Sequence, residues 1–207
     1  MRKSKVIMGV MAMAMVAALT ACGTKATKET KTETTTANAA NSSEITGDGV
    51  ATKGQLVMVT NLEFPPFEYR ENDQPTGIDV DIAKEVAKKM GLELKVDDIA
   101  FDSIIPELVS GKADISFAGM TVTEDRKQSV DFTQTYAKAS QMIIVKNDSS
   151  IAGPDDLKNK RIGVQQGTTG DLFSSTVEGA TIERYNKGME AVQALVQGKV
   201  DAVVIDE

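Results

Sequence analysis

The stretch GIDVDIAKEVAKKMG, residues 77–91, decides the fold. Its larger apolar side chains recur at the i, i+4 spacing of a helix, at Ile78, Ile82, Val86 and Met90. Asp79 and Asp81 fall in the first turn, where the helix dipole favours negative charge. Gly91 is a natural C-terminal cap. The stretch therefore predicts a helix that begins after Gly77 and ends at Gly91.

Strand-like and helix-like segments alternate around this helix. Short apolar segments predict strands at 56–60, 92–96, 114–118, 141–146, 161–165, 181–185 and 200–206. Helical patterns lie between them, at 102–111, 154–158, 168–177 and 188–198. The side chains expected to face inward are Ile104, Ile105 and Leu108 in the first of these helices, and Met189, Val192, Leu195 and Val196 in the last. Such alternation is typical of parallel α/β sheets, and here it forms two runs, about 55–138 and 143–207.

The beginning of the chain predicts export. Arg2, Lys3 and Lys5 precede an apolar run at 6–19, which is the pattern of a secretory signal. That run is shorter than the roughly 18 residues that a membrane-spanning helix needs. It ends in LTACG, residues 19–23, which resembles the bacterial lipobox. We therefore expect residues 1–21 to be a lipoprotein signal peptide; the alternative is a plain secretory signal with an incidental cysteine.

The lipobox resemblance implies that Cys22 carries lipid and anchors the protein to the bacterial cell membrane, outside the cytoplasm. Several acyl chains on one residue would make this attachment stable, since one chain alone holds only marginally. Residues 22–52 contain no aromatic side chain and are rich in Thr, Ala, Lys, Glu, Asn and Ser. Such a segment buries too little apolar surface to order itself, so it predicts a disordered tether.

The composition excludes several classes of function. A net charge of −7 over 207 residues argues against a general nucleic-acid binder, which needs clustered positive charge. The single cysteine excludes an internal disulfide and a cysteine-rich metal site. The absence of histidine excludes histidine-based triads and the common zinc sites. We expect neither a metal nor a cofactor.

Several separated motifs resemble the family 3 extracellular solute-binding proteins, the polar amino-acid receptors of ABC importers. They are GIDVDI at 77–82 with Val86, Ala87 and Met90; FPPFE at 64–68; AGMTVT at 118–123 with Arg126; VDF at 130–132; GVQQGTT at 163–169; and DA at 201–202 through DE at 206–207. The resemblance implies a periplasmic-binding-protein-like α/β fold with two lobes, each a mainly parallel sheet flanked by helices. The first lobe would span 53–140 and the second 141–207.

The resemblance also implies how a free amino acid is held. Arg126 stands in the position that binds the carboxylate, which suits the fork of donors that Arg supplies. Thr121 and the backbone at Gly119 would add hydrogen bonds, and Thr168 and Thr169 a second contact at a helix start. Without the resemblance, Arg126 would be a surface charge and Thr168 an ordinary helix cap.

The remaining positions concern the ammonium group and the ligand side chain. The resemblance assigns Asp206, at the carboxyl end of a strand, to the ammonium; the alternative is a loop aspartate that caps a helix. Phe64 and Phe101 would sandwich the side chain, unless they pack in the core. Three further residues would tune specificity: Asn61, Ala118 and Gln165. They favour a glutamine-like ligand over a basic one, and Glu63 is expected to face solvent.

The function implied is a binding protein, not an enzyme, that delivers a polar amino acid to the permease of an ABC importer. An exported enzyme on the same fold and the sensory domain of a receptor are the alternatives. Family members continue beyond the position of Glu207 with a second crossover and further helices. We therefore expect the chain to be truncated at its C-terminus, with the second lobe and the closing elements incomplete. Residues 53–207 alone would then be less stable than the completed protein and bind no amino acid tightly.

Overall fold

The computed structural model describes residues 49–207. The predicted signal peptide, the lipidation of Cys22 and most of the predicted tether lie outside the described residues. Near the start of the described residues, the backbone N–H of Ala51 donates a hydrogen bond to the carboxylate of Asp114. Among residues 49–207, the structure contains no helix with the length and apolar character that crossing a membrane requires.

The first sheet is parallel and has the strand order β5-β1-β6. Its strands are β1 (Gln55–Thr60), β5 (Glu93–Asp98) and β6 (Ile115–Ser116). The side chains of β1 alternate between two core clusters. Val57 and Val59 pack with Ile104, whereas Met58 packs with Ala83. The sheet is therefore covered by a helix on each face, as a βαβ arrangement requires.

The helix predicted from residues 77–91 is present as α1 (Ile78–Lys89). Its buried face consists of Val80, Ala83 and Ala87, together with Asp79. Ile78, at the start of the apolar series, is 46% exposed. The large apolar side chains thus lie at the flank of α1, because the small alanines are the residues that approach the sheet.

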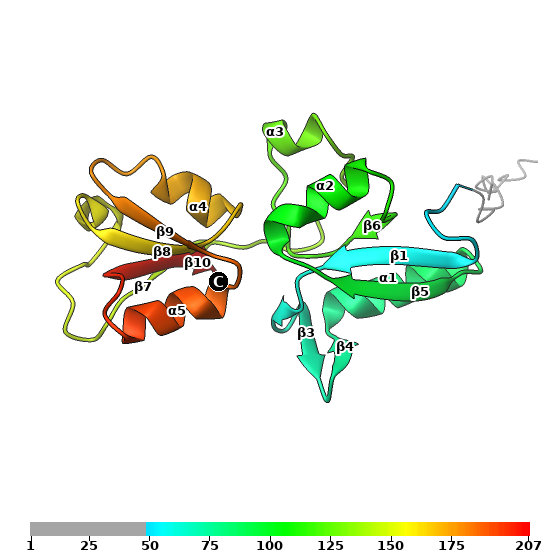
Figure 1. The fold of residues 1–207 in the computed structure, drawn as a ribbon, viewed down its shortest axis with the longest axis horizontal. Helices are drawn as coiled ribbons and strands as arrows, with labels where there is room; N and C mark the ends of the chain where they lie inside the picture. The colour runs from blue at the N-terminus through cyan, green and yellow to red at the C-terminus, as the bar shows by residue number, and fades with distance from the viewer. Residues whose placement is uncertain (1–48) are drawn as a thin grey trace, which may run out of the picture. The chain divides into compact units, whose positions relative to one another are not determined.

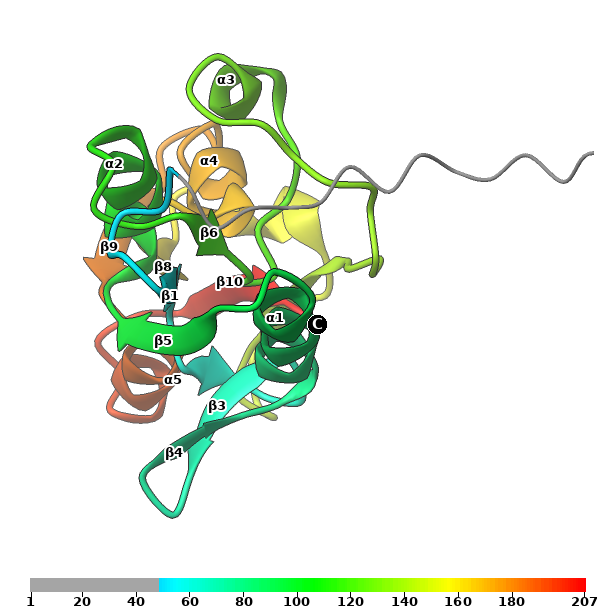
Figure 2. The same ribbon diagram turned by 90° about the vertical axis from the view of Figure 1, so that its right-hand side faces the viewer.

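A small antiparallel sheet precedes α1 and was not expected from the sequence. It consists of β2 (Glu63–Phe64), β3 (Glu68–Glu71) and β4 (Gln74–Thr76). Figure 2 shows the β3–β4 hairpin beside α1. The turn at 65–67 is fixed to the start of α1, since Pro66 O accepts from Ile78 N–H and Phe67 O from Asp79 N–H, at 3.1 and 2.9 Å.

The helix predicted at 102–111 divides into a short 3-10 helix (Phe101–Ser103) and α2 (Ile104–Val109). Ile104 is fully buried, while Ile105 and Leu108 are half-buried. A single turn, α3 (Glu124–Lys127), follows the first sheet. Residues 128–140 then continue without helix or strand to the second sheet, and we call them the crossover.

The second sheet has the order β7-β10-β8-β9, with only β7 antiparallel. Its strands are β7 (Gln141–Ile144), β8 (Arg161–Gln165), β9 (Thr181–Tyr185) and β10 (Ala202–Asp206). A 3-10 helix (Pro154–Leu157) precedes β8. Figure 1 shows α4 (Thr169–Ser174) and α5 (Gly188–Val196) on opposite faces of this sheet. The mainly parallel α/β class predicted from the sequence is confirmed.

The inward face predicted for α5 is wrong at two positions. Met189 is 56% exposed and Val196 is 72% exposed. The residues buried against the sheet are Ala191, Ala194 and Leu195. As in α1, small side chains allow the helix backbone to approach the strands, so the bulkier apolar residues are displaced toward solvent.

Candidate ligand-binding site

All eleven residues predicted to bind a ligand line one cavity of about 210 Å³. They are Asn61, Phe64, Phe101, Ala118, Gly119, Thr121, Arg126, Gln165, Thr168, Thr169 and Asp206. Six other residues complete the lining: Glu63, Pro65, Glu68, Gly188, Met189 and Ile205. Among residues 49–207, no group of three or more Asp, Glu, Cys or His side chains is arranged to hold a metal ion.

Strand ends bring the polar residues of the cavity together. Asn61 directly follows β1, Gln165 ends β8 and Asp206 ends β10. These strands belong to two different sheets, so the cavity lies where the carboxyl ends of both sheets meet. This is the usual position of a ligand in an α/β fold.

Arg126, in α3, is held by two carbonyl groups. Its Nη1 donates to Thr121 O at 2.6 Å, and its Nη2 donates to Gly167 O at 2.9 Å. Its guanidinium carbon lies 5.5 Å from the centre of the Phe101 ring. Burial lowers the pKa of Arg126, and the charge of Asp206 opposes that shift. The guanidinium is thus partly desolvated and fixed in direction, and it has five N–H donors in all.

Asp206 supplies the opposite charge. Burial raises the pKa of its carboxyl group, and the positive charge of Arg126 partly offsets this. Gln141, the partner of Asp206 in the β10–β7 pairing, donates from its side-chain amide to Oδ1. The cavity therefore contains a cation from the first-sheet region and an anion from the second.

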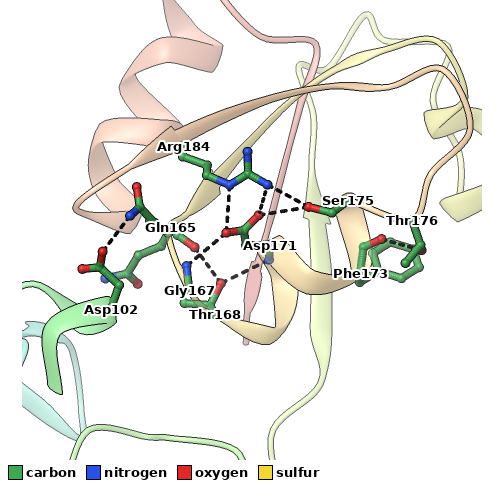
Figure 3. A network of polar contacts seen from close by, with 10 residues as sticks. Asp102, Gln165, Gly167, Thr168, Asp171, Phe173, Ser175, Thr176 and Arg184 are labelled. Carbon is green, nitrogen blue, oxygen red and sulfur yellow. Dashed lines mark hydrogen bonds and ion pairs between the residues drawn. The ribbon is translucent and has the colours of Figure 1, made fainter. Parts of the chain in front are cut away.

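The loop at 167–169 is supported by the polar network in Figure 3. Asp171 accepts a hydrogen bond from the Gly167 backbone N–H at 3.1 Å and forms a two-point contact with Arg184 at 3.1 and 2.9 Å. Ser175 bonds to both of these side chains. The negative charge of Asp171 is therefore balanced by Arg184. Asp171 in turn fixes Gly167, whose carbonyl group accepts a hydrogen bond from Arg126.

Thr168 acts as the N-cap of α4. Its hydroxyl donates to Gln165 O at 2.8 Å and accepts from Asp171 N–H at 3.3 Å. The only proton of this hydroxyl is thus engaged, so the hydroxyl cannot also donate to a ligand carboxylate. The Thr169 hydroxyl accepts from the Gln141 amide at 3.0 Å.

Asn61 and Gln165 bind each other across the cavity. Gln165 Nε2 donates to Asn61 Oδ1 at 2.9 Å and to Asn186 O at 3.2 Å. Asn61 Nδ2 donates to Ile99 O at 2.9 Å. These bonds use the Gln165 side-chain N–H groups and leave its side-chain carbonyl as an acceptor in a residue that lines the cavity.

Glu63 was expected to face solvent, and this expectation is wrong. Its carboxylate is 21% exposed, lines the cavity and forms an ion pair with Lys187. The pairing of two charges 124 positions apart leaves no signal in a single sequence.

No role was assigned to Glu68 from the sequence, although it ends the FPPFE motif at 64–68; in the structure it is 1% exposed. Burial, reinforced by the negative charge of Asp79, raises its pKa to about 10. A glutamate is rarely buried, and the hints in the sequence were its place in that motif and its position between Phe67 and Tyr69.

Comparison with known proteins extends these observations. The family described as bacterial extracellular solute-binding proteins, family 3, matches residues 56–206. The arginine-binding extracellular protein ArtP of Bacillus subtilis is 39% identical over 158 residues, which cover 75% of this chain and 62% of that protein. Across the first curated relatives, this chain spans only 57–62% of their length.

Solved structures share the fold. The arginine-bound, truncated ArgBP of T. maritima superposes with a TM-score of 0.74 and 42% identity, covering 77% of each chain. The ancestral amino-acid-binding protein AncCDT-1, described as a precursor of cyclohexadienyl dehydratase, superposes with a TM-score of 0.67 and 38% identity. The match covers 74% of this chain and 70% of that one.

Proposed function

Because the chain belongs to family 3 of the bacterial extracellular solute-binding proteins, we propose that it captures a free polar amino acid outside the cytoplasm and delivers it to the permease of an ABC importer. The observation that carries this proposal is the pair of opposite charges, Arg126 and Asp206, in one cavity. Every free α-amino acid carries one carboxylate and one ammonium group, so this pair matches the part that all such ligands share.

Arg126 is the proposed partner of the ligand carboxylate. Two of its N–H groups are used to fix its position, which leaves donors for a two-point contact. Asp206 is the proposed partner of the ammonium group. Both groups are partly desolvated, which strengthens their attraction for a charged ligand. Thr121, Thr168, Thr169 and the Gly119 backbone are proposed as further polar contacts. The Thr168 hydroxyl proton is already donated to Gln165 O and the Gly119 N–H to Asp79, so in this structure neither group is free to donate to the ligand.

The ligand side chain would lie between the rings of Phe64 and Phe101. Beyond them, the Gln165 carbonyl and the Glu63 carboxylate are acceptors, while Asn61 is already engaged. A cavity end with acceptors favours a side chain rich in donors. We therefore place arginine first, in agreement with the arginine-binding relatives, and glutamine second.

The proposed location is the outer face of the cell membrane. The family match supports export. The lipid anchor at Cys22 and the tether at 22–52 remain proposals based on sequence. Mass spectrometry of the mature N-terminus tests the anchor: a diacylglyceryl-modified Cys22 is expected, and cleavage elsewhere would contradict it.

An enzyme on the same fold is the second candidate, and the likeness to a precursor of cyclohexadienyl dehydratase favours it. Carboxyl groups are the acid–base groups available in the cavity, since the chain has no histidine. Incubation with a cyclohexadienyl substrate, followed by product analysis, distinguishes the two: turnover supports the enzyme, and an unchanged substrate supports binding alone.

Isothermal calorimetry tests the main proposal. Arginine, glutamine and glycine would be titrated into this chain and into the same chain extended by the C-terminal segment of ArtP. Saturable one-to-one binding of arginine, with weaker binding of glutamine, is expected in the extended protein. If no amino acid binds to either protein, the proposal is wrong.

A further inference from the structure

Two buried carboxyl groups meet at the cavity wall, where Glu68 is one of the lining residues. Glu68, on β3, is 1% exposed, and Asp79, in the first turn of α1, is fully buried. Phe67, the residue before Glu68, accepts a hydrogen bond from the Asp79 backbone N–H at 2.9 Å, which brings the two carboxyl groups to one place. The charge of Asp79 helps to raise the pKa of Glu68. Glu68 Oε2 and Asp79 Oδ1 nevertheless find no N–H or O–H donor among residues 49–207. Ionised carboxylates only accept hydrogen bonds, so neither group can satisfy the other while both are charged.

We propose that Glu68 keeps a proton, which it donates to Asp79, and that this acid–carboxylate pair is a positioning element that holds Gly119 and Tyr136 at the wall of the ligand cavity. One shared proton satisfies both orphaned oxygens. It also removes the cost of burying two like charges side by side.

The surroundings place the proton on Glu68. Asp79 Oδ2 already accepts two hydrogen bonds, from the Tyr136 hydroxyl at 3.0 Å and from the Gly119 backbone N–H at 3.3 Å. Donors of this kind favour the ionised carboxylate. Among residues 49–207, no group donates such a hydrogen bond to Glu68 Oε2, and burial and the neighbouring Asp79 raise the pKa of Glu68 to about 10.

The groups facing this pair come from every element packed against it. Asp79 comes from α1, Glu68 from the hairpin, and Tyr136 from the crossover. Burial and Asp79 raise the pKa of Tyr136 too, so its hydroxyl stays a donor at ordinary pH. No lysine or arginine in the described part of the chain lowers the pKa of Glu68.

Asp79 joins three parts of the cavity wall. Its backbone N–H donates to Phe67 O, which fixes the turn that presents Phe64. Its carboxylate holds the Gly119 amide, and Gly119 lies against the Phe64 ring so closely that a Cβ there would be 3.4 Å from it. Its bond to Tyr136 ties the crossover to the same point. Glu68 lines the cavity itself, and it acts on Gly119 and Tyr136 through Asp79.

The shared proton predicts a pH dependence with a definite sign. The pKa of Glu68 is raised from 4.5 to about 10 on folding. Between these values the folded protein holds a proton that the unfolded chain releases. The stability that this group contributes is therefore fully present below pH 4.5 and is lost as pH rises toward 10, with the unfolding constant increasing up to about tenfold per pH unit from this group alone.

Urea unfolding of the whole chain at pH 6, 7, 8 and 9 tests this, with no ligand present. The unfolding constant of the wild type should rise with pH more steeply than that of Glu68→Gln, by up to about tenfold per unit. The matched control is Glu71→Gln, an exposed glutamate on the same strand, which should follow the wild type. Equal slopes in the wild type and Glu68→Gln would overturn the proposal.

A second measurement does not depend on whether the variants fold. The infrared spectrum of the wild-type protein at pH 8 should contain the carbonyl band of a protonated carboxyl group, and its absence would overturn the shared proton.

Hydrogen exchange tests the positioning role. The Gly119 amide should exchange at least about tenfold faster in Glu68→Ala and regain protection in Glu68→Gln, which keeps a neutral donor. Unchanged exchange in folded Glu68→Ala would overturn the positioning role. Neither readout requires an amino-acid ligand, so failure here is distinct from failure of the proposed function.

Discussion

Arg126 and Asp206 are the two side chains on which the proposed ligand depends most. Removal of one partner from a desolvated charge pair costs about 2–5 kcal/mol, and about 1.4 kcal/mol corresponds to tenfold in affinity. Arg126→Ala and Asp206→Ala should each weaken binding roughly thirtyfold to several thousandfold. The loss should be similar for arginine and glutamine, because both ligands share the groups that are contacted. Calorimetry on the folded variants of the extended protein measures it.

Lys127→Ala is the matched control for Arg126. Lys127 is the next residue of α3, and its exposed ammonium pairs with Glu124, so its loss should leave affinity unchanged. Wild-type affinity in Arg126→Ala or Asp206→Ala would remove the amino-acid proposal and indicate a ligand without the corresponding charged group.

The positions of single site residues could be predicted where a motif fixes them at a strand end or next to a tight turn. Asn61, Gln165 and Asp206 follow this rule, and the structure brings them to one cavity. Their hydrogen-bond partners could not be predicted, because each depends on a residue far away in the sequence. Glu63 was misjudged and Glu68 was missed for the same reason. The surroundings of each carboxylate depend on a residue elsewhere in the chain, which is Lys187 for Glu63 and Asp79 for Glu68.

At the level of elements, the loop between β8 and α4 depends on a bidentate ion pair. Arg184→Lys replaces the fork that holds Asp171 by a single point charge. Because Asp171 also holds the Gly167 N–H, both stability and affinity should fall. A loss of roughly 1–2 kcal/mol in unfolding free energy is expected, discounted for the partly exposed arginine, with a several-fold weaker affinity.

Arg161→Lys separates the two effects. Arg161 makes a similar two-point contact with Asp201 at the opposite end of β8, at 3.2 and 2.6 Å. This substitution should lower stability in urea unfolding but leave affinity as it is. If Arg184→Lys also leaves affinity unchanged, the loop does not depend on Asp171 for its position.

Gly77 controls the junction between the hairpin and α1. Its φ is +119°, and a Cβ there would overlap the carbonyl of Phe67. Gly77→Ala should therefore destabilise the protein by about 2–5 kcal/mol, from backbone strain and overlap together. Gly91→Ala is the control, since its φ is +66° and no atom lies within 4 Å of its Cβ. It should cost only the strain, about 1 kcal/mol. Similar losses for both in thermal unfolding would show that the overlap relaxes.

Elements with a strong apolar pattern were predictable, and those with a polar one were not. β8 and β9 have the bounds expected from the sequence, because their patterns are bordered by turn residues. The β3–β4 hairpin was missed, since EYRE and QPT carry no apolar alternation. Its turn at Asn72 and Asp73, both with positive φ, was the available signal. The faces of α1 and α5 were misjudged because alanines pack more closely than larger side chains.

At the scale of the whole described unit, residues 53–140 and 141–207 contact each other through polar pairs around the cavity. Arg126 reaches Gly167, Gln165 reaches Asn61, and Gln166 Nε2 donates to Asp102 at 2.6 Å. Lys187 and Glu63 form an ion pair between the same two regions. Polar pairs of this kind can separate into water at low cost, so they suit a cavity that must open for ligand exchange.

The ion pair between Lys187 and Glu63 should slow ligand release, because opening of the cavity would break it. Its partners are partly exposed, so its contribution is about 0.2–1 kcal/mol. Lys187→Met should therefore raise the rate of ligand release up to about fivefold. Stopped-flow displacement of bound arginine measures that rate. The difference from the wild type should shrink as salt screens the charges.

Lys158→Met distinguishes the proposed role from a general effect of charge. Lys158 pairs with Glu178 within residues 141–207 at 3.2 Å, and its side chain is 58% exposed, against 48% for Lys187. Its loss changes the net charge by the same amount but breaks no contact between the two regions. Release should therefore stay at the wild-type rate in Lys158→Met. If both variants release the ligand equally fast, the net charge of the protein controls release, and the Lys187–Glu63 pair contributes nothing to holding the cavity closed.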